Sequence, residues 1–177
     1  MTPASEPMIR HATVSDATLL AELGRNTFLE AFTDRIRKED LIPYVDARFG
    51  LAQQASELAD PHVIFFIAEV GGVPAGYAKL CESVPPDCIL DPHPLEMERL
   101  YISQQWLGRG IANALTDACL VEASRRGYKT LWLDVWERNE RARAFYRKYG
   151  FEEVGSRLYM VGTDAQTHLL MVRSLLG

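Results

Sequence analysis

The feature that most constrains this chain is a change of hydrophobic period within residues 95–123. Over the first eight of these residues, alternate positions fall on opposite faces, as in a β-strand. From Ile111 onward, apolar residues recur every three or four positions, as on one side of a helix. The stretch therefore predicts a strand, a short turn and a helix. The strand would carry Leu100 and Ile102 on one face with Met97 and Tyr101 on the other, and the helix would bury Ile111, Ala114, Leu115, Ala118 and Val121.

Two glycines flank Arg109 at the predicted junction. Backbone N–H groups in the first turn of a helix have no partner within the helix, and the helix dipole adds positive potential there. Glycine also lets the backbone approach a bulky anion and adopt a positive φ. Gly108, Arg109 and Gly110 therefore form either a cradle for a phosphate or an ordinary turn. A Gly-x-Gly pair alone favours the ordinary turn.

Two nucleotide-binding motifs can be compared with this junction. A P-loop requires Gly-Lys-Ser/Thr, which is absent here. A dinucleotide-binding turn requires a third glycine where Asn113 stands, although Asp134 lies at a suitable distance downstream for a ribose contact. A nucleotide-binding regulator or a nicotinamide-dependent oxidoreductase therefore stays a weaker alternative.

Two longer motifs resemble one known family. The run from Gln105 to Ala112 (Gln-x-x-Gly-x-Gly-x-Ala), directly after Leu100-Tyr101-Ile102, resembles the acetyl-CoA-binding motif of the GNAT superfamily of N-acetyltransferases. The run from Asn139 to Phe151 resembles the C-terminal motif of that family, Asn-x-x-Ala-x-x-Phe-Tyr-x-x-x-Gly-Phe. The two motifs occur in the family's order and at its usual separation, so together they are much more specific than either one alone.

The rest of the chain fits one α/β domain over residues 8–177, preceded by a disordered tail at 1–7. A chain of 177 residues, 47% of them hydrophobic, can bury one sizeable core. The resemblance implies the GNAT fold, a mixed, mostly antiparallel twisted sheet of about seven strands flanked by about four helices. The strands are expected at 8–13, 63–70, 74–81, 95–102, 130–135, 151–161 and 167–175, with 95–102 and 130–135 parallel to each other. The helices are expected to end near Phe32 and to span 35–49, with a break or kink at Pro43, then 51–59, 111–126 and 139–149.

Charge and cysteine content narrow the function classes. The formal net charge of −5 argues against nucleic acid or an anionic membrane as the main partner. No apolar run approaches the ~20 residues of a membrane span, and the first residues lack the apolar core of a signal peptide. Cys81, Cys88 and Cys119 are odd in number and irregularly spaced, which argues against a disulfide framework or a metal site. We expect a reduced, cytoplasmic protein without a metal, in which Cys119 packs on its helix.

The resemblance implies transfer of an acetyl group from acetyl-CoA, the co-substrate, to a primary amine, with no covalent enzyme intermediate. It assigns the pantetheine to the end of the central strand and the pyrophosphate to the backbone of the glycine turn. Leu107 stands where the family often has a basic residue, a departure that leaves the backbone donors intact. The implied cofactor-binding residues are Leu100, Tyr101, Ile102, Gln105, Leu107, Gly108, Arg109, Gly110, Ile111, Ala112, Asn139 and Tyr146.

The resemblance also implies three catalytic residues. Tyr146 matches the family tyrosine near the CoA sulfur, and a phenol with an ordinary pKa of about 10 can protonate a leaving thiolate at neutral pH. Glu96 and Glu98 are expected on one face of the central strand, where partial burial can raise a carboxyl pKa and suit a general base. Glu96 matches the catalytic glutamate of some members, whereas many others use water chains, and the oxyanion would meet the N–H of Ile102. The structural alternatives are a core tyrosine and a solvated strand start.

Two short phrases, at residues 9–32 and 97–103, resemble the polyamine-acetylating branch of the family. They favour a spermidine- or spermine-like acceptor, with other small amines, amino-acid amines and a protein N-terminus as alternatives. Phe28 and Phe32 are the expected substrate-binding residues, although amphipathic helix packing explains them as well. A non-catalytic acyl-CoA-binding regulator is the alternative function, and the family resemblance also allows a homodimer.

Overall fold

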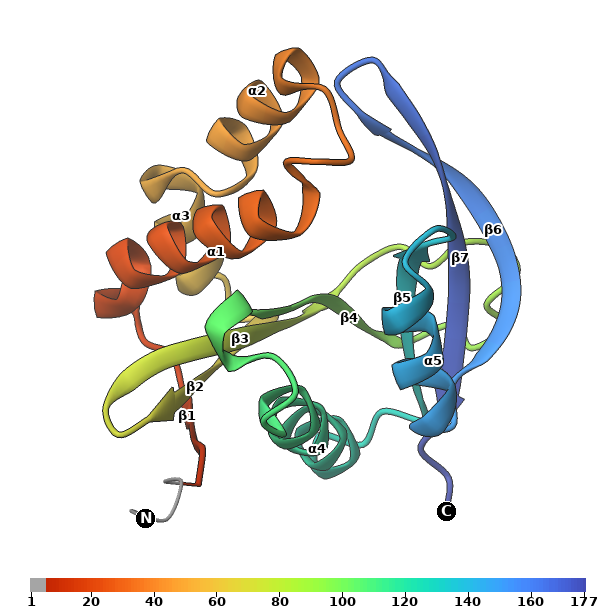
Figure 1. The fold of residues 1–177 in the computed structure, drawn as a ribbon. Helices are drawn as coiled ribbons and strands as arrows, with labels where there is room; N and C mark the ends of the chain where they lie inside the picture. The colour runs from red at the N-terminus through yellow and green to blue at the C-terminus, as the bar shows by residue number, and fades with distance from the viewer. Residues whose placement is uncertain (1–5) are drawn as a thin grey trace.

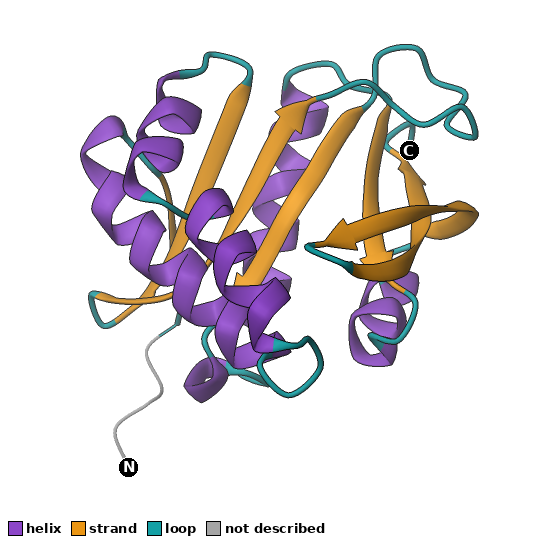
Figure 2. Ribbon diagram, turned by 90° about the horizontal axis from the view of Figure 1, so that it is seen from above, coloured by secondary structure: helices purple, strands orange, loops and turns teal. Residues whose placement is uncertain are grey.

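A seven-stranded sheet with helices on both faces forms the molecule in the computed structural model, which describes residues 6–177 (Figures 1 and 2). The strand order is β1-β2-β3-β4-β5-β7-β6, and only β4 and β5 are parallel, joined by the crossover through α4 as expected. Most of the expected tail lies outside the described residues. The strands are β1 (Met8–His11), β2 (Val63–Val70), β3 (Val73–Glu82), β4 (Leu95–Ile102), β5 (Thr130–Trp136), β6 (Glu152–Val161) and β7 (Asp164–Ser174).

Five α-helices accompany the sheet in residues 6–177, at the five places expected. They are α1 (Ala17–Phe32), α2 (Lys38–Arg48), α3 (Leu51–Ala59), α4 (Ile111–Arg125) and α5 (Glu140–Lys148), with 3₁₀ turns at η1 (Val14–Asp16) and η2 (Gln104–Trp106). Of the break or kink expected at Pro43, the break is wrong, because α2 runs through this residue without interruption. Pro43 lies in the second turn, where it costs the helix one backbone hydrogen bond.

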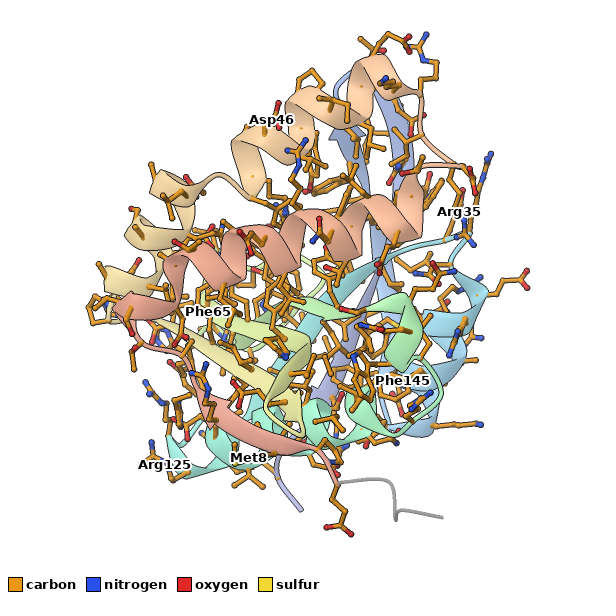
Figure 3. All side chains as sticks on the ribbon, turned by 60° about the vertical axis from the view of Figure 1, so that its left-hand side comes forward. Met8, Arg35, Asp46, Phe65, Arg125 and Phe145 are labelled. Carbon is orange, nitrogen blue, oxygen red and sulfur yellow. The ribbon has the colours of Figure 1, made fainter. Side chains whose placement is uncertain are left out.

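The two faces of the sheet have separate cores. The core under α4 and α5 joins apolar residues of β2 to β5 and includes Leu131, Leu133 and Val135, which lie on one face of β5. The opposite face packs against α1, α2 and α3, with Phe65 between sheet and helices (Figure 3). On α4 the buried side is Ile111, Leu115 and Cys119. Val121 is 68% exposed, so its expected burial is wrong, because the buried stripe turns toward Glu122 and Ala123 at the end of the helix.

A β-bulge in β4 changes which side chains share a face. Arg99 pairs with Lys79, and Met97 pairs with the next residue of β3, so Glu98 has no partner in the ladder. One extra residue shifts the alternation of a strand by one position. Met97 therefore packs in the α4 core with Leu100 and Ile102, and its expected place beside Tyr101 is wrong. Tyr101 lies on the opposite face, under α1 and α2.

Candidate active site

A cavity of about 630 Å³ opens where β4 and β5 diverge. These parallel strands pair only at Leu95↔Leu131 and Glu96↔Trp132, and beyond this point they separate (Figure 1). Residues of both halves of the sheet, of α1, α2 and α5, and of the turn before α4 line the cavity. The cavity includes these predicted site residues: Phe28, Phe32, Glu96, Glu98, Leu100, Tyr101, Ile102, Leu107, Gly108, Gly110, Ile111, Ala112, Asn139 and Tyr146.

Two predicted cofactor-binding residues, Gln105 and Arg109, lie outside this lining and are exposed. The guanidinium of Arg109 lies over the ring of Trp106, 5.2 Å from its centroid. This contact leaves Arg109 at the rim of the cavity, where it adds positive charge near the glycine turn.

The glycine turn has the geometry of an anion cradle. Gly108 and Gly110 have φ values of 75° and 78°, a region that residues with a Cβ rarely adopt. Gly110 is the N-cap of α4, and an added Cβ at either glycine would meet no atom within 4 Å. Ile111, Ala112 and Asn113 of the first turn of α4 line the cavity, so N–H groups that have no partner within the helix lie at its wall, as binding of a pyrophosphate requires.

The end of β4 turns backbone donors away from β3, toward the cavity. The N–H of Ser103 bonds the carbonyl of Ala75 in β3, at 2.9 Å. Donors alternate in direction along an antiparallel strand, so the N–H of Ile102 points away from β3 toward the separated β5. This is the place predicted for the oxyanion.

Tyr146 and Asn139 lie on α5, across the gap from β4. Asn139 caps α5, its Oδ1 accepting the N–H of Ala142 at 3.2 Å, and it also lines the cavity. Tyr146 is 9% exposed and packs edge-on against Phe145 and Phe151. Burial raises the pKa of the Tyr146 phenol well above its ordinary value, so it stays protonated at every physiological pH.

Glu96 and Glu98 both face the side of the sheet that carries α1 to α3, but their environments differ. Glu96 is 7% exposed and accepts a hydrogen bond from Ser83 Oγ at 2.5 Å. Burial raises the pKa of Glu96, and the negative charge of Glu98 raises it further, whereas the hydrogen bond from Ser83 lowers it. Glu98 Oε2 lies 2.5 Å from Lys79 Nζ. Burial alone would raise the Glu98 pKa, but the charges of Arg99, Lys79 and Arg48 outweigh it and hold this pKa below its ordinary value.

A polar cluster that the sequence did not reveal lines the β5–β7–β6 wall. Asp134 accepts hydrogen bonds from Arg157 Nε at 2.8 Å and lies 3.1 Å from His168 Nδ1. His168 Nε2 lies 2.9 Å from Gln166 Oε1, and the His168 ring stacks on Tyr159 with centroids 4.4 Å apart. The suggested ribose contact of Asp134 is therefore unsupported, because this carboxylate is committed to neighbours inside the cavity.

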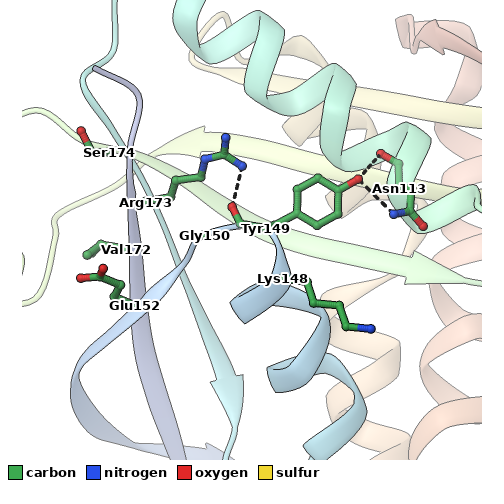
Figure 4. A pocket seen from close by; sticks show the side chains of 8 residues that line it. All are labelled: Asn113, Lys148, Tyr149, Gly150, Glu152, Val172, Arg173 and Ser174. Atoms are coloured by element: carbon green, nitrogen blue, oxygen red, sulfur yellow. Dashed lines mark hydrogen bonds between the residues drawn. The ribbon is translucent and has the colours of Figure 1, made fainter. Parts of the chain in front are cut away.

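A second pocket, of about 670 Å³, lies behind the end of α5 (Figure 4). Its wall holds Lys148, Glu152 and Arg173, and Arg173 Nη1 donates to the carbonyl of Tyr149 at 2.5 Å. The Tyr149 hydroxyl contacts Asn113 on α4 and so separates this pocket from the glycine turn. None of the predicted catalytic residues lies here, which leaves the cavity between β4 and β5 as the candidate active site.

Three further observations concern metal binding, membrane spanning and the cysteines. Among residues 6–177, no group of three or more His, Cys, Asp or Glu side chains could hold a metal ion. No helix within the described part of the chain is long and apolar enough to cross a membrane. Cys119 is fully buried, as expected, and Cys81 is buried as well.

The chain was compared with known proteins. The family model described as "Acetyltransferase (GNAT) family" matches residues 26–151. An uncharacterized N-acetyltransferase of Mycobacterium bovis is 32% identical over 92% of this chain and 99% of its own length. Another, from Lactobacillus delbrueckii subsp. lactis, is 29% identical over 86% of this chain and 88% of its own length.

Solved structures agree on the fold. The PaiA N-acetyltransferase from Thermoplasma acidophilum, in complex with coenzyme A, superposes with a TM-score of 0.73 and 16% identity, covering 96% of this chain and 99% of that one. Its identity is too low to carry more than the fold. The family match and the mycobacterial relative carry the assignment, and the glycine turn and the cavity have the geometry it requires. This chain belongs to the GNAT family of acetyltransferases.

Proposed function

We propose that this acetyl-CoA-dependent N-acetyltransferase passes the acetyl group directly to a primary amine held beside Glu96. The observation that carries the proposal is the single cavity that joins the glycine turn to a buried carboxyl group. Holding amine and thioester together in such a cavity supplies much of the acceleration through positioning alone. The amine attacks the thioester carbonyl, a tetrahedral intermediate forms, and the C–S bond breaks to release CoA.

Glu96 is the better candidate for the general base. An attacking amine must lose a proton, and a base works best when its pKa lies near the working pH. The raised pKa of Glu96 moves it in that direction. The charges of Arg99, Lys79 and Arg48 keep Glu98 ionised, and Glu98 pairs closely with Lys79, so we assign Glu98 a structural role as the partner of Lys79.

Tyr146 and the N–H of Ile102 complete the proposed mechanism. The phenol of Tyr146 keeps its proton and can pass it to the departing thiolate. The N–H of Ile102, at the point where β4 leaves its neighbour, can donate to the oxyanion. Both groups lie on the cavity wall.

Substitution of Tyr146 by phenylalanine should lower kcat by about 10- to 100-fold, with KM for acetyl-CoA unchanged. The loss is at the modest end for an acid catalyst because a thiol, with a pKa near ~8.5, is already a good leaving group. Steady-state release of CoA, followed with a thiol reagent, measures it. Tyr149→Phe, on the same helix end but at the second pocket, is the matched control. Equal losses in the two variants would mean that Tyr146 acts through packing only.

The first experiment is a thermal shift with acetyl-CoA, CoA and NAD side by side, followed by thiol release with a panel of amines. Stabilisation by acetyl-CoA together with turnover supports the proposal. Tight CoA binding without turnover on any amine would favour the non-catalytic regulator. Stabilisation by NAD alone would revive the dinucleotide hypothesis. The polyamine acceptor stays a prediction, and spermidine and spermine in the amine panel test it. The homodimer also stays a prediction, and size-exclusion chromatography with light scattering measures the oligomeric state.

A further inference from the structure

We propose that the acceptor carries a carboxylate as well as its amine, as a free amino acid does, and that Arg48 binds this carboxylate. The inference rests on the proposed function, because it names the substrate class of the same cavity. It comes from the unsatisfied hydrogen bonds and the charge around Arg48.

Arg48 lies in the last turn of α2, and its guanidinium forms part of the cavity wall together with Glu98. The side chain is 21% exposed. The guanidinium carbon lies 5.7 Å from the ring centroid of Tyr44 and 6.0 Å from that of Phe49. Two aromatic faces thus hold the group in place without using its hydrogen-bond donors.

The protein supplies few hydrogen-bond acceptors to the guanidinium of Arg48. Nη1 of Arg48 donates to the Tyr159 hydroxyl at 3.3 Å, and Nη2 lies 3.8 Å from Glu98 Oε1, beyond hydrogen-bond range. The buried Nε has no partner among the described residues. A guanidinium has five N–H donors in a planar fork that suits two carboxylate oxygens.

Two neighbouring arginines each donate from two nitrogens to one carboxylate, although Nε of Arg99, like Nε of Arg48, has no partner among the described residues. Arg99 donates two hydrogen bonds of 2.9 Å to the two oxygens of Glu57. Arg157 donates from two nitrogens to Asp134. Arg48 lacks an equivalent carboxylate, although it also lies against the cavity. A carboxylate of the substrate would complete the pattern.

The local charge points the same way. Behind Arg48 lies a buried ionic cluster in which Lys79 Nζ is 3.3 Å from Glu57 and 2.5 Å from Glu98, and Arg99 pairs with Glu57. With Arg48 included, the cluster holds three cations and two carboxylates, and Arg48 is the cation that lies furthest from a carboxylate oxygen. Water screens such a charge poorly when it is partly buried, so it favours an anionic partner in the cavity.

Glu96 lies in the same cavity and can receive the proton of an attacking amine. An acceptor that places its amine at Glu96 and its carboxylate at Arg48 is an amino acid or a close relative of one. A polyamine would instead bring a second cation toward the positive charge of Arg48. The charge around Arg48 thus argues against the polyamine expected from the sequence.

The test compares acceptors that differ only in the carboxylate. Ornithine and putrescine, lysine and cadaverine, and phenylalanine and phenethylamine are three such pairs. In the pair that the enzyme uses best, we expect kcat/KM to be at least 10-fold higher for the amino acid than for the amine that lacks the carboxylate. Binding is measured separately by calorimetry on the CoA-bound protein, so the carboxylate preference can be read even where no thiol is released. Absence of turnover with all amines would contradict the proposed function, whereas equal or better binding of the decarboxylated amines would overturn this inference.

Substitutions of Arg48 test whether this residue causes the preference for acceptors with a carboxylate. In Arg48→Met, which keeps a long apolar stem, KM for the preferred acid should rise about 10-fold or more and KM for its amine partner should stay the same. Arg48→Lys keeps the charge but loses the fork and should fall between. Arg25→Met, which removes an exposed arginine paired with Asp46, is the control. If Arg48→Met weakened acid and amine equally while the acetyl-CoA thermal shift was retained, Arg48 would have no carboxylate role.

Discussion

Replacing Glu96 by glutamine should lower kcat by about 10²- to 10⁴-fold, the contribution of a positioned general base. Glutamine has the same shape and can still accept the hydrogen bond of Ser83, so the cavity is preserved. The residual rate should rise with pH as free amine becomes more abundant. The wild type should instead lose activity on the acid side as Glu96 becomes protonated. The measurement is a pH–rate profile of CoA release for both proteins.

The same variant should not lose stability at neutral pH. A carboxyl whose pKa is raised in the folded state retains its proton there at pH values where the unfolded chain has released it. Folding stability of the wild type therefore falls as pH rises from the ordinary carboxyl pKa of 4.5 through the raised pKa of Glu96. Glu96→Gln lacks this dependence, so its melting temperature relative to wild type should increase across that interval. Glu98→Gln should behave oppositely and lose stability, because it leaves Lys79 with less compensation. If Glu96→Gln kept full activity, a water molecule rather than Glu96 would be the general base.

Replacing Gly110 by glutamate should abolish binding of acetyl-CoA. The position has a φ of 78°, and the new carboxylate would lie where the first-turn N–H groups of α4 meet the pyrophosphate. At 100 times its dissociation constant, acetyl-CoA should stabilise the wild type by about 2.7 kcal/mol, or roughly 5–10 °C for a chain of this length. The variant should show no such shift.

Gly72→Glu is the matched control for this substitution. Gly72 also has a positive φ, of 79°, has open space around it, and lies in the β2–β3 turn away from the cavity. Its variant pays the same backbone strain and gains the same charge, yet should keep the full acetyl-CoA shift. If Gly72→Glu lost the shift too, or Gly110→Glu kept it, the glycine turn would not be the pyrophosphate site.

Most of the regular structure could be predicted from local pattern. The helix at 51–59 has the expected bounds, because Gly50 and Pro61 delimit it locally. The strand at 63–70 also has the expected bounds, because it is a continuous apolar run between two turns. The crossover from β4 through α4 to β5 followed from its length and period. The prediction that the glycine turn binds the cofactor comes from motif resemblance, since Gly-x-Gly alone does not distinguish a cradle from a turn.

What the sequence did not reveal depends on contacts between distant segments. The bulge at Glu98 exists only relative to β3, so the chain alone gave the wrong face to Met97. Asp134, Arg157 and His168 come from three strands whose order, β5-β7-β6, brings them together. Arg48 reaches the cavity because α2 packs against β6, a contact that nothing in the sequence of α2 indicates.

The narrow pairing of β4 with β5 divides the sheet into two parts. β1 to β4 form one plate and β5 to β7 the other, and along this seam only Leu95↔Leu131 and Glu96↔Trp132 are in register. The core under α4 holds the plates on one face, while the cavity separates them on the other. Glu96 lies at the paired end of this seam and Ile102 at its open end, so both belong to the first plate. Residues of both plates line the cavity, so a ligand that spans it adds contacts across a seam where the strand pairing supplies few.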